Sequence, residues 1–416
     1  MPIASPRQFR IVIVGGGIAG LASAIALRGT DREIIILEAS RMNKEVGAAI
    51  SVDLHESLKR LATDPSPPGN PATIRVASKV LSCDCDSGVV TLENGETIQG
   101  DLVIGADGIH SKIRASVVGK EMTASPTGLS AYRLIIPKEQ LLTIPHVSAM
   151  MTDEYPWSTM LLGRDCRVVM GPCRNQELLS IVALVPDTSS SWTAQGSLED
   201  LLKSFDDFPP WIKDTFKNVC SQSMSRYQSM AITRHGKQPL SFLHLLHVKY
   251  LPPSHSLTPS IPLFSTAQEA LPTWYKGRTI LIGDAAHSML PLQGQGASQS
   301  IEDAEALGHF FRDIHVGTSG PAVPVAMEDV TRRLEQVFEA RYERASLIQQ
   351  YSRQAGKPAT EAGSNVITMY VCHDYHRWQP TSLLEHFTDC QNRSRLVGTQ
   401  PSSWTTIVDI PAQKLG

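Results

Sequence analysis

Three glycines near the amino terminus have the spacing of a phosphate-binding turn. Gly15, Gly17 and Gly20 follow an apolar run at 11–14 and lead into an alanine-rich stretch at 21–28. In a strand, turn and helix of this kind, the first glycine permits the tight turn and the second lets the backbone approach a pyrophosphate. The third lets the helix pack close to the strand, and the free N–H groups at the helix start attract phosphate. The spacing therefore predicts a dinucleotide site.

An acidic residue stands where the ribose of such a dinucleotide would lie. Glu38 closes a second apolar run at 34–37, and a carboxylate there can accept hydrogen bonds from ribose hydroxyls. A glycine-rich turn in an ordinary α/β protein is the alternative, but the order of strand, turn, helix, strand and acid favours dinucleotide binding. The uncharged run 11–27 could also suggest a signal peptide or membrane anchor. Its glycines and the break at Gly29 fit a turn and a short helix better.

Two aspartates follow other strand-like runs. Asp107 comes after the apolar run 102–104, and Asp284 ends another apolar run and precedes a small-residue loop with Gly296 and Ala297. Loops at the carboxyl edge of a sheet are where α/β proteins bind ligands. Asp284 can hold a ribose or ribityl hydroxyl, and the following turn with its helix N-terminus can solvate an anionic ring or a phosphate. Taken alone, Asp107 also fits a turn or a helix cap.

Composition limits the classes of function. The chain has 416 residues, 42% of them hydrophobic and 19% charged, which suits a soluble protein of two or three domains. A net charge of -3 gives no reason to expect nucleic acid or acidic lipid as a partner. The seven cysteines include no CxxC pair and are typical of reduced thiols. We therefore expect a cytoplasmic protein without a membrane span.

Metal binding is weakly indicated. Cys83 and Cys85 stand two residues apart in a group of short β-type runs, but no second cysteine pair or histidine cluster accompanies them. His244 with His247, and His373 with His376, have loose metal-like spacing and also lack a matching set of ligands. We predict structural cysteines and no metal.

The elements that must position these residues form an α/β pattern interrupted by a β-rich stretch. A leucine repeat predicts a helix over 52–61, and short β runs with an Asn94-Gly95 hairpin turn follow between 73 and 98. From 123 to about 274 alternating runs, such as 130–136 and 178–185, predict an inserted sheet. The stretch 330–351 predicts a helix whose charged residues, Arg341 among them, form a solvated surface.

Together these motifs resemble the FAD-dependent aromatic hydroxylases, which are single-component flavoprotein monooxygenases. The salicylate-hydroxylase-like branch, common in fungal secondary metabolism, is the most similar. The matching residues are GGGIAG at 15–20 with Glu38, GADGIHSKIR at 105–114, Ala131-Tyr-Arg133, and GDAAHSMLPLQGQGASQSIEDAEAL at 283–307. The resemblance covers residues 9 to about 355. Several ordered motifs with these spacings make a chance match improbable.

The resemblance implies a fold, an activity and a site. The fold is α/β, with a discontinuous Rossmann-like FAD-binding domain (1–122 and 272–356), an inserted β-rich substrate domain (123–271), C-terminal helices and a C-terminal extension (357–416). FAD is the cofactor, and NAD(P)H and O₂ act with it on an aromatic or polyketide-type small molecule. Arg133 faces the substrate and stabilises a phenolate or carboxylate. The FAD-contacting residues are Gly15, Gly17, Gly20, Glu38, Ala49, Asp107, Asp284, Gly296 and Ala297.

Two of the chain's departures from the family pattern involve whole segments. Family members have further elements, ending in an FAD-binding arginine, where Ile50 is here joined directly to Ser51. The stretch from Leu246 to about Gln268 has no family counterpart and is rich in serine, proline and leucine. A skipped exon and a retained intron would account for both departures. Two alternatives remain: a degenerate FAD-binding homologue without turnover, and an NAD-dependent dehydrogenase, which would show no flavin spectrum.

Overall fold

A computed structural model describes most of the chain. The described residues are 7–42, 49–120, 125–151, 159–163, 165–173, 177–186, 198–217, 258–265, 270–290, 294–314, 325–355 and 407–409. At some of these positions, Ala49 and Arg133 among them, only the backbone is described. Within these ranges no helix is long and apolar enough to cross a membrane.

The first sheet is six-stranded, in the order β13-β14-β7-β1-β2-β3. Its strands are β1 (Phe9–Val14), β2 (Arg32–Leu37), β3 (Thr73–Arg75), β7 (Leu102–Gly105), β13 (Tyr275–Lys276) and β14 (Thr279–Leu281). All neighbouring pairs are parallel except β13 with β14. The central strands β1 and β7 are apolar and almost wholly buried, as expected for a parallel sheet covered on both faces.

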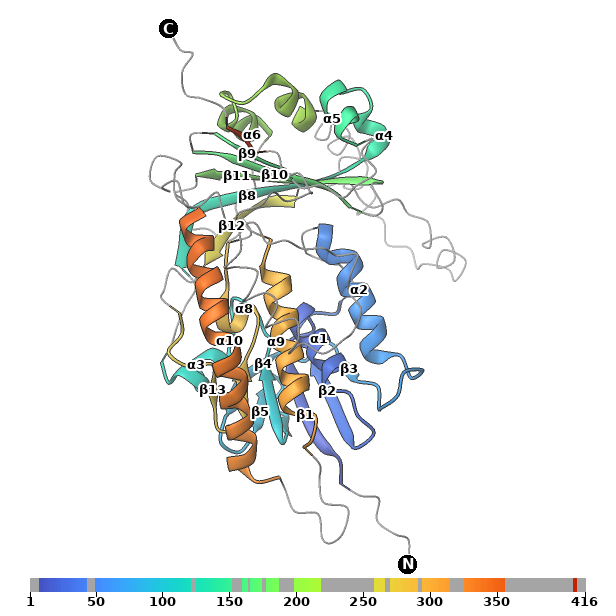
Figure 1. The fold of residues 1–416 in the computed structure, drawn as a ribbon, viewed down its shortest axis with the longest axis vertical. Helices are drawn as coiled ribbons and strands as arrows, with labels where there is room; N and C mark the ends of the chain where they lie inside the picture. Colours follow the sequence, from blue (N-terminus) through green and yellow to red (C-terminus); the bar gives the residue numbers. More distant parts are fainter. Residues whose placement is uncertain are drawn as a thin grey trace, which may run out of the picture.

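Helices pack around this sheet. They are α1 (Ile18–Ala26), α2 (Ala49–Thr63), α3 (Ile113–Val118), α8 (Asp284–His287), α9 (Gly296–Phe310) and α10 (Met327–Ala355). The alanine-rich α1 lies between α2 and α9, and α9 packs in turn against the long α10 (Figure 1). Small side chains on α1 allow this close packing, because they leave little bulk between the helix axes.

A small antiparallel sheet lies beside the first sheet. It contains β4 (Val80–Asp84), β5 (Val89–Leu92) and β6 (Thr97–Gln99). The predicted hairpin turn is confirmed, because Asn94-Gly95 joins β5 to β6 and Gly95 has a φ of 85°. Cys83 and Cys85 are buried free thiols. The run at 73–76, predicted with these short strands, instead adds β3 to the parallel sheet beside β2.

The second sheet is also six-stranded, in the order β12-β8-β11-β10-β9-β15. Its strands are β8 (Ser125–Pro137), β9 (Thr159–Leu162), β10 (Arg167–Cys173), β11 (Leu178–Pro186), β12 (Thr258–Ser265) and β15 (Ile407–Asp409). The helices α4 (Lys138–Leu141), α5 (Pro145–Met150) and α6 (Leu198–Ser204), with a helix at 210–217, cover the face that is turned away from the first sheet (Figure 1).

Alternate residues of β8 face opposite sides of the second sheet. Tyr132 and Leu134 pack into the core beneath the helices, with aromatic residues such as Phe205. Ala131 belongs to a different cluster, which includes Leu290 from the loop after α8. The other face of the second sheet therefore meets the loops of the first.

The predicted fold class is confirmed: a Rossmann-like parallel sheet is combined with a β-rich unit and C-terminal helices. The domain boundaries stay predictions. Two stretches that were not expected to form strands contribute to the second sheet. Residues 258–265, assigned to an insertion from the sequence, form β12, and residues 407–409 of the C-terminal extension form β15.

Candidate functional site

The first sheet brings the predicted loops to its carboxyl edge. From β1 the chain continues to β2 on one side, and later returns to β7 on the other side of β1. Ligands of α/β proteins bind at such a switch point, beyond the carboxyl ends of the strands. The loop after β1 carries Gly15 and Gly17, β7 is followed by Asp107, and β14 leads to Asp284. Glu38 directly follows β2.

These loops touch one another through positions where a side chain would not fit. Gly15 has a φ of 106°, and a Cβ there would lie 2.3 Å from the carbonyl oxygen of Ala106. A Cβ on Gly20 would lie 2.0 Å from the carbonyl oxygen of Gly15, so α1 packs directly on the turn. A Cβ on Gly283 would lie 2.9 Å from that of Ala19. The glycine motif thus contacts the other two motifs.

Gly17 differs from its neighbours because it faces open space. A Cβ added there would meet no heavy atom within 4 Å among the described residues, and its backbone is extended, with a φ of -77°. A side chain at this position would therefore cause no clash with that part of the protein. Among the described residues, the glycine therefore leaves room that a bound molecule could fill.

Two helices begin at this edge without a capping side chain. The N-cap of α1 is Gly17 and that of α9 is Gln295, and neither makes a side-chain capping hydrogen bond. Neither first turn contains an acidic residue. Positions 294 and 296 beside the α9 start are glycines at which a Cβ would also meet no heavy atom of the described residues within 4 Å. Free N–H groups and the helix dipole give both ends a preference for anions.

Glu38 and His55 both contact Gly16, which lies between Gly15 and Gly17 in the turn. One carboxylate oxygen of Glu38 accepts a hydrogen bond from the Gly16 amide at 2.8 Å, and the other accepts from Ser40 at 2.7 Å. Nε2 of His55, on α2, lies 2.8 Å from the carbonyl oxygen of Gly16. An ionised carboxylate has about four acceptor positions, so Glu38 can still accept from ribose hydroxyls.

Asp284 is exposed to solvent at the start of α8, although protein surrounds it on its other sides. Burial raises the pKa of Asp284, while the nearby His287 and Arg114 act to lower it. The side chain therefore reaches solvent, while the protein atoms packed around it disfavour its charged form. It is suited to hydrogen bonding with a hydroxyl group of a ligand that displaces water.

The raised pKa predicts how Asp284→Asn changes stability. The folded protein binds more protons than the unfolded chain between about pH 3.9, the ordinary value, and the raised pKa. Stability from this group is therefore present at low pH and is lost as pH rises through the folded pKa. We expect the variant apoprotein to have a higher melting temperature than the unmutated apoprotein at pH 8. The difference between the two melting temperatures should be smaller at pH 4. A gap that does not change with pH would contradict burial as the source of the difference.

Arg114 joins the second and third motifs from a buried position. Its guanidinium donates to the carbonyl oxygens of Ala285 at 2.8 Å and Asp284 at 3.0 Å. It also donates to those of Ile109 at 3.0 Å and Gly108 at 3.2 Å. Burial lowers the pKa of Arg114, and the carboxylates of Asp107 and Asp284 oppose that effect. This side chain fixes the distance between the two loops.

Asp107 caps the helix that follows it. Its Oδ2 accepts from the amide of Lys112 at 2.7 Å, and its Oδ1 has no hydrogen-bond partner among the described residues. The capping role considered from the sequence is therefore present, and one buried oxygen is left for another donor. A direct contact of Asp107 with a cofactor stays a prediction.

Ala49 and Arg133 are placed only by their backbone. Ala49 begins α2, three residues before the predicted helix start. In β8, Arg133 pairs with Val182 of β11 and with Thr258 of β12. Val182 packs against the cluster of Ala131 and Leu290, and directly paired residues share a face of a sheet. Position 133 therefore lies on the face turned toward the first sheet.

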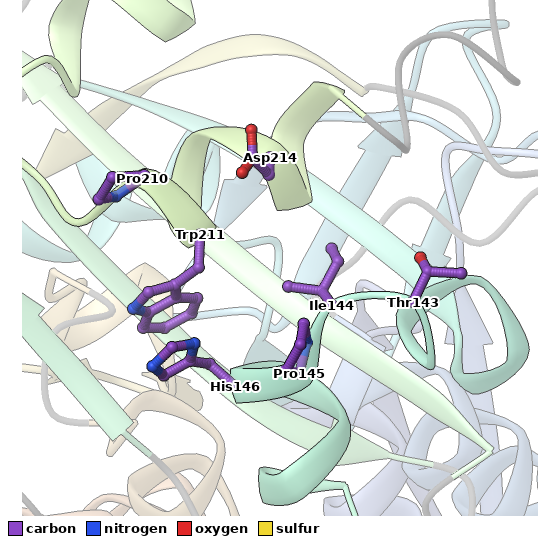
Figure 2. Close-up of a pocket in the computed structure, with 7 residues that line it drawn as sticks. All are labelled: Thr143, Ile144, Pro145, His146, Pro210, Trp211 and Asp214. Carbon is purple, nitrogen blue, oxygen red and sulfur yellow. The ribbon is translucent and has the colours of Figure 1, made fainter.

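A separate groove lies on the outer side of the second sheet. It has a volume of 520 Å³ and is lined by Thr143, Ile144, Pro145, His146, Pro210, Trp211 and Asp214 (Figure 2). The rings of His146 and Trp211 stack at a centroid distance of 5.9 Å. The helices around it cover the face away from the first sheet (Figure 1), so this groove is distinct from the site at the carboxyl edge.

The described residues contain no group of three or more histidine, cysteine or acidic side chains arranged to hold a metal. The histidine pairs at 244 and 247 and at 373 and 376 lie outside the described residues.

Sequence reasoning missed several residues of this site. The sequence indicates His55 only as part of a helix and of an Asp-Leu-His match to the family, and Arg114 only as part of a matching motif. Asp303, which accepts a hydrogen bond from the Gly283 amide at 2.9 Å, was assigned no role. The signal available for Arg114 and Asp303 was their position inside the two quoted motifs. No local pattern indicates that His55 reaches the carbonyl of Gly16.

Two family profiles match the chain. Residues 253–324 match the FAD binding domain, and residues 9–132 match the pyridine nucleotide-disulphide oxidoreductases. The first match begins inside the stretch from 246 to about 268, so the expectation that this whole stretch lacks a family counterpart is wrong.

Fungal proteins and solved structures are similar over most of the chain. This chain is 32% identical over 320 residues to the FAD-dependent monooxygenase phomE of Diaporthe leptostromiformis. The alignment covers 73% of this chain and 76% of that protein. The chain is 26% identical over 441 residues to the FAD-dependent monooxygenase ntnJ of Nectria sp, covering 91% and 96%. A salicylate hydroxylase in a substrate complex has a similar fold, with a TM-score of 0.57 at 22% identity, covering 86% and 92%.

The alignment with ntnJ also shows a difference in length between the two proteins. Its 441 positions exceed the 416 residues of this chain, so ntnJ has internal segments that are absent here. Missing family elements at the junction of Ile50 and Ser51 stay a prediction.

Proposed function

Because this chain belongs to the family of FAD-dependent monooxygenases, we propose that it uses NAD(P)H and O₂ to add oxygen to an aromatic or polyketide-type small molecule. It is an enzyme whose cofactor is FAD. The observation that carries the proposal is the meeting of three motifs at one sheet edge, between two uncapped helix starts. A secondary-metabolite substrate is suggested by the fungal relatives.

The residues present fit FAD. Gly17 leaves open space at the α1 start, where a pyrophosphate could approach, and Gly15 and Gly20 allow the close packing of that turn. Glu38 keeps acceptor capacity for a ribose. Asp284 is exposed beside this turn and can bind ribityl hydroxyls. These assignments stay proposals.

The remaining residues that we propose to contact FAD lie at the same edge. Gly296 and Ala297 begin α9, whose free N–H groups would stabilise negative charge on the flavin ring. Asp107 has one oxygen without a partner among the described residues. Ala49 would contribute backbone contact at the start of α2. When bound, FAD supplies hydride acceptance and activation of O₂, while the chain supplies position and shelter from water.

The substrate is proposed to bind between the second sheet and the loop after α8. There Ala131 and Leu184 pack with Leu290, which joins an apolar sheet face to the loop that follows Asp284. Position 133 lies on this face, opposite Val182. A guanidinium at this place would bind a phenolate or carboxylate and hold the reacting ring in register with the flavin.

Arg133→Lys is expected to weaken substrate use more than FAD content. Lysine keeps the positive charge but loses the planar fork that binds a carboxylate with two hydrogen bonds. We expect roughly a tenfold or greater loss in kcat/KM, since a charge-assisted hydrogen bond contributes about 1.5 to 3 kcal/mol. Flavin absorbance per protein measures FAD content. Equal loss of flavin and activity would instead mean that Arg133 supports the fold or the cofactor.

A direct test uses the purified protein and a panel of aromatic compounds. We expect a flavin spectrum, NADPH oxidation that depends on one class of aromatic compound, and a product heavier by one oxygen atom. Labelled O₂ should place its isotope in that product. Bound flavin without turnover would favour the degenerate homologue, and absence of flavin with NAD-dependent activity would favour a dehydrogenase.

We also propose a cytoplasmic location. Cys83, Cys85 and Cys166 are free thiols, which agrees with a reducing compartment, and NADPH is available there.

A further inference from the structure

A buried line of charged side chains connects α10 to the turn that carries Asp284. Asp303, on α9, is fully buried, and its Oδ2 lies 2.6 Å from Nε2 of His287. Its Oδ1 accepts from Nε of Arg341 at 3.0 Å. Arg341 is only 2% exposed, so the sequence interpretation that placed it on a solvated helix surface is wrong. The buried guanidinium is retained because Asp303 and its neighbours satisfy it.

The other donors of Arg341 are also satisfied. Nη1 of its guanidinium donates to Glu302, and Nη2 donates to Oε1 of Gln299 at 2.7 Å. Burial acts to raise the pKa of Asp303, but His287 and Arg341 outweigh that effect and lower it to about 2. Asp303 is therefore ionised throughout the range in which the protein would work. Breaking such a buried pair leaves an uncompensated charge.

His287 depends on Asp303 for its orientation. Its Nδ1 is buried and has no hydrogen-bond partner among the described residues. Its ring packs on Trp274 at a centroid distance of 5.0 Å. Without Asp303, packing against Trp274 would be the main restraint on this ring.

The same carboxylate oxygen also holds the other end of the turn. Oδ2 of Asp303 accepts from the Gly283 amide at 2.9 Å. Gly283 has a φ of 57°, and a Cβ there would lie 2.9 Å from Oγ of Ser300. Gly283 and His287 flank Asp284 on opposite sides, so one buried oxygen fixes both ends of the segment that presents Asp284.

The buried face of α10 continues along the next loop. Gln349 donates to the carbonyl oxygen of Ser288 at 2.9 Å, and Ser352 donates to that of Leu290 at 2.6 Å. Arg341, Gln349 and Ser352 are spaced at eight and three residues, which places them along one side of the helix. The turn and the loop that follows are both supported by α10.

We propose that Asp303 and Arg341 are positioning residues for FAD: through His287 and Gly283 they hold the turn so that Asp284 can bind the ribityl chain. The inference rests on the proposed function. It assigns a role to α10, which is not part of the glycine motif and does not contain Glu38. Neither side chain needs to touch the cofactor.

The test compares Asp303→Asn and Arg341→Lys with a matched control, Arg332→Lys. Arg332 lies on the same helix and is exposed, where it pairs with Asp329. FAD is titrated into each apoprotein by fluorescence, the visible spectrum of bound FAD is recorded, and circular dichroism gives the apoprotein melting temperature. We expect Asp303→Asn to raise the FAD dissociation constant roughly ten- to a hundredfold and to alter the flavin spectrum, as loss of an outer support does at other sites.

Arg341→Lys should have a smaller effect of the same kind, because it keeps the charge and loses the fork. Arg332→Lys should change neither the dissociation constant nor the spectrum. Lower melting temperatures with unchanged FAD affinity and spectrum would overturn the inference and leave Asp303 as a fold support only. If Asp303→Asn does not fold, Arg341→Lys decides by the same measures. If the unmutated protein binds no FAD, both this inference and the proposed function are overturned. If the unmutated protein turns over normally and the variants keep its FAD affinity and flavin spectrum, only this inference is overturned.

Discussion

Gly17→Val is expected to leave the apoprotein folded and to remove FAD binding. The Gly17 backbone is extended, which suits a β-branched residue, and a Cβ there meets nothing within 4 Å among the described residues. The same space is where a pyrophosphate would have to approach the α1 start. We expect the FAD dissociation constant to rise at least about a hundredfold, which is about 2.7 kcal/mol. Flavin titration of the apoprotein measures this effect.

Gly20→Ala is the matched comparison. A Cβ on Gly20 would lie 2.0 Å from the carbonyl oxygen of Gly15, which is backbone and cannot rotate away. We expect this variant to lose about 3 kcal/mol of unfolding free energy, the upper range for overpacking. Urea unfolding of the two apoproteins should therefore separate them. A destabilised Gly17→Val protein, or one that still binds FAD normally, would contradict the proposed placement of the pyrophosphate.

Features that depend on neighbouring residues could be predicted from the sequence. The turn after β1, the Asn94-Gly95 hairpin and the strands that lead to Asp107 and Asp284 follow from local glycine positions and apolar runs. The parallel sheet edge then follows, because consecutive strand and helix patterns favour that arrangement. This is why most of the candidate site could be named in advance.

Features that depend on distant partners could not be predicted. The short run that forms β3 has no local property that selects the parallel sheet over the antiparallel one, and its neighbour is β2. Arg341 has the same pattern of surrounding charges in the sequence as an exposed arginine. Its burial is explained by its contacts with Asp303, Glu302 and Gln299, which lie about 40 residues away on α9. Glu38 was predicted at the correct place, but its hydrogen bonds to Gly16 and Ser40 depend on the folded turn.

Restoring the elements missing at Ile50 is expected to strengthen FAD binding. The family arginine that ends those elements has no counterpart here, and a charge-assisted hydrogen bond contributes about 1.5 to 3 kcal/mol, or roughly ten- to a hundredfold in dissociation constant. The missing elements would also cover part of the sheet and the cofactor, so we expect their absence to expose apolar surface and to admit water. We expect the present chain to be poorly soluble or to bind FAD weakly, and to lose NADPH oxidation as hydrogen peroxide.

The insertion point lies within helix α2. In this chain α2 runs without interruption from Ala49 to Thr63, so Ile50 and Ser51 lie within its first turns. His55, further along the same helix, still reaches the Gly16 carbonyl at 2.8 Å. An insertion after Ile50 would therefore shorten the start of α2 but leave its anchor on the glycine turn in place.

The experiment inserts the corresponding segment of ntnJ between Ile50 and Ser51. Two controls separate its effects: a glycine and serine linker of equal length, and the same segment with its arginine replaced by glutamine. We expect the segment to lower both the FAD dissociation constant and the peroxide yield. The form with glutamine should lower only the peroxide yield, because it still shelters the flavin from water. The linker should lower neither. If the chain without any insertion purifies with stoichiometric FAD and couples NADPH oxidation tightly to product, the shortened FAD-binding domain is a working architecture, and His55 with Glu38 is then sufficient to hold the turn without the family arginine.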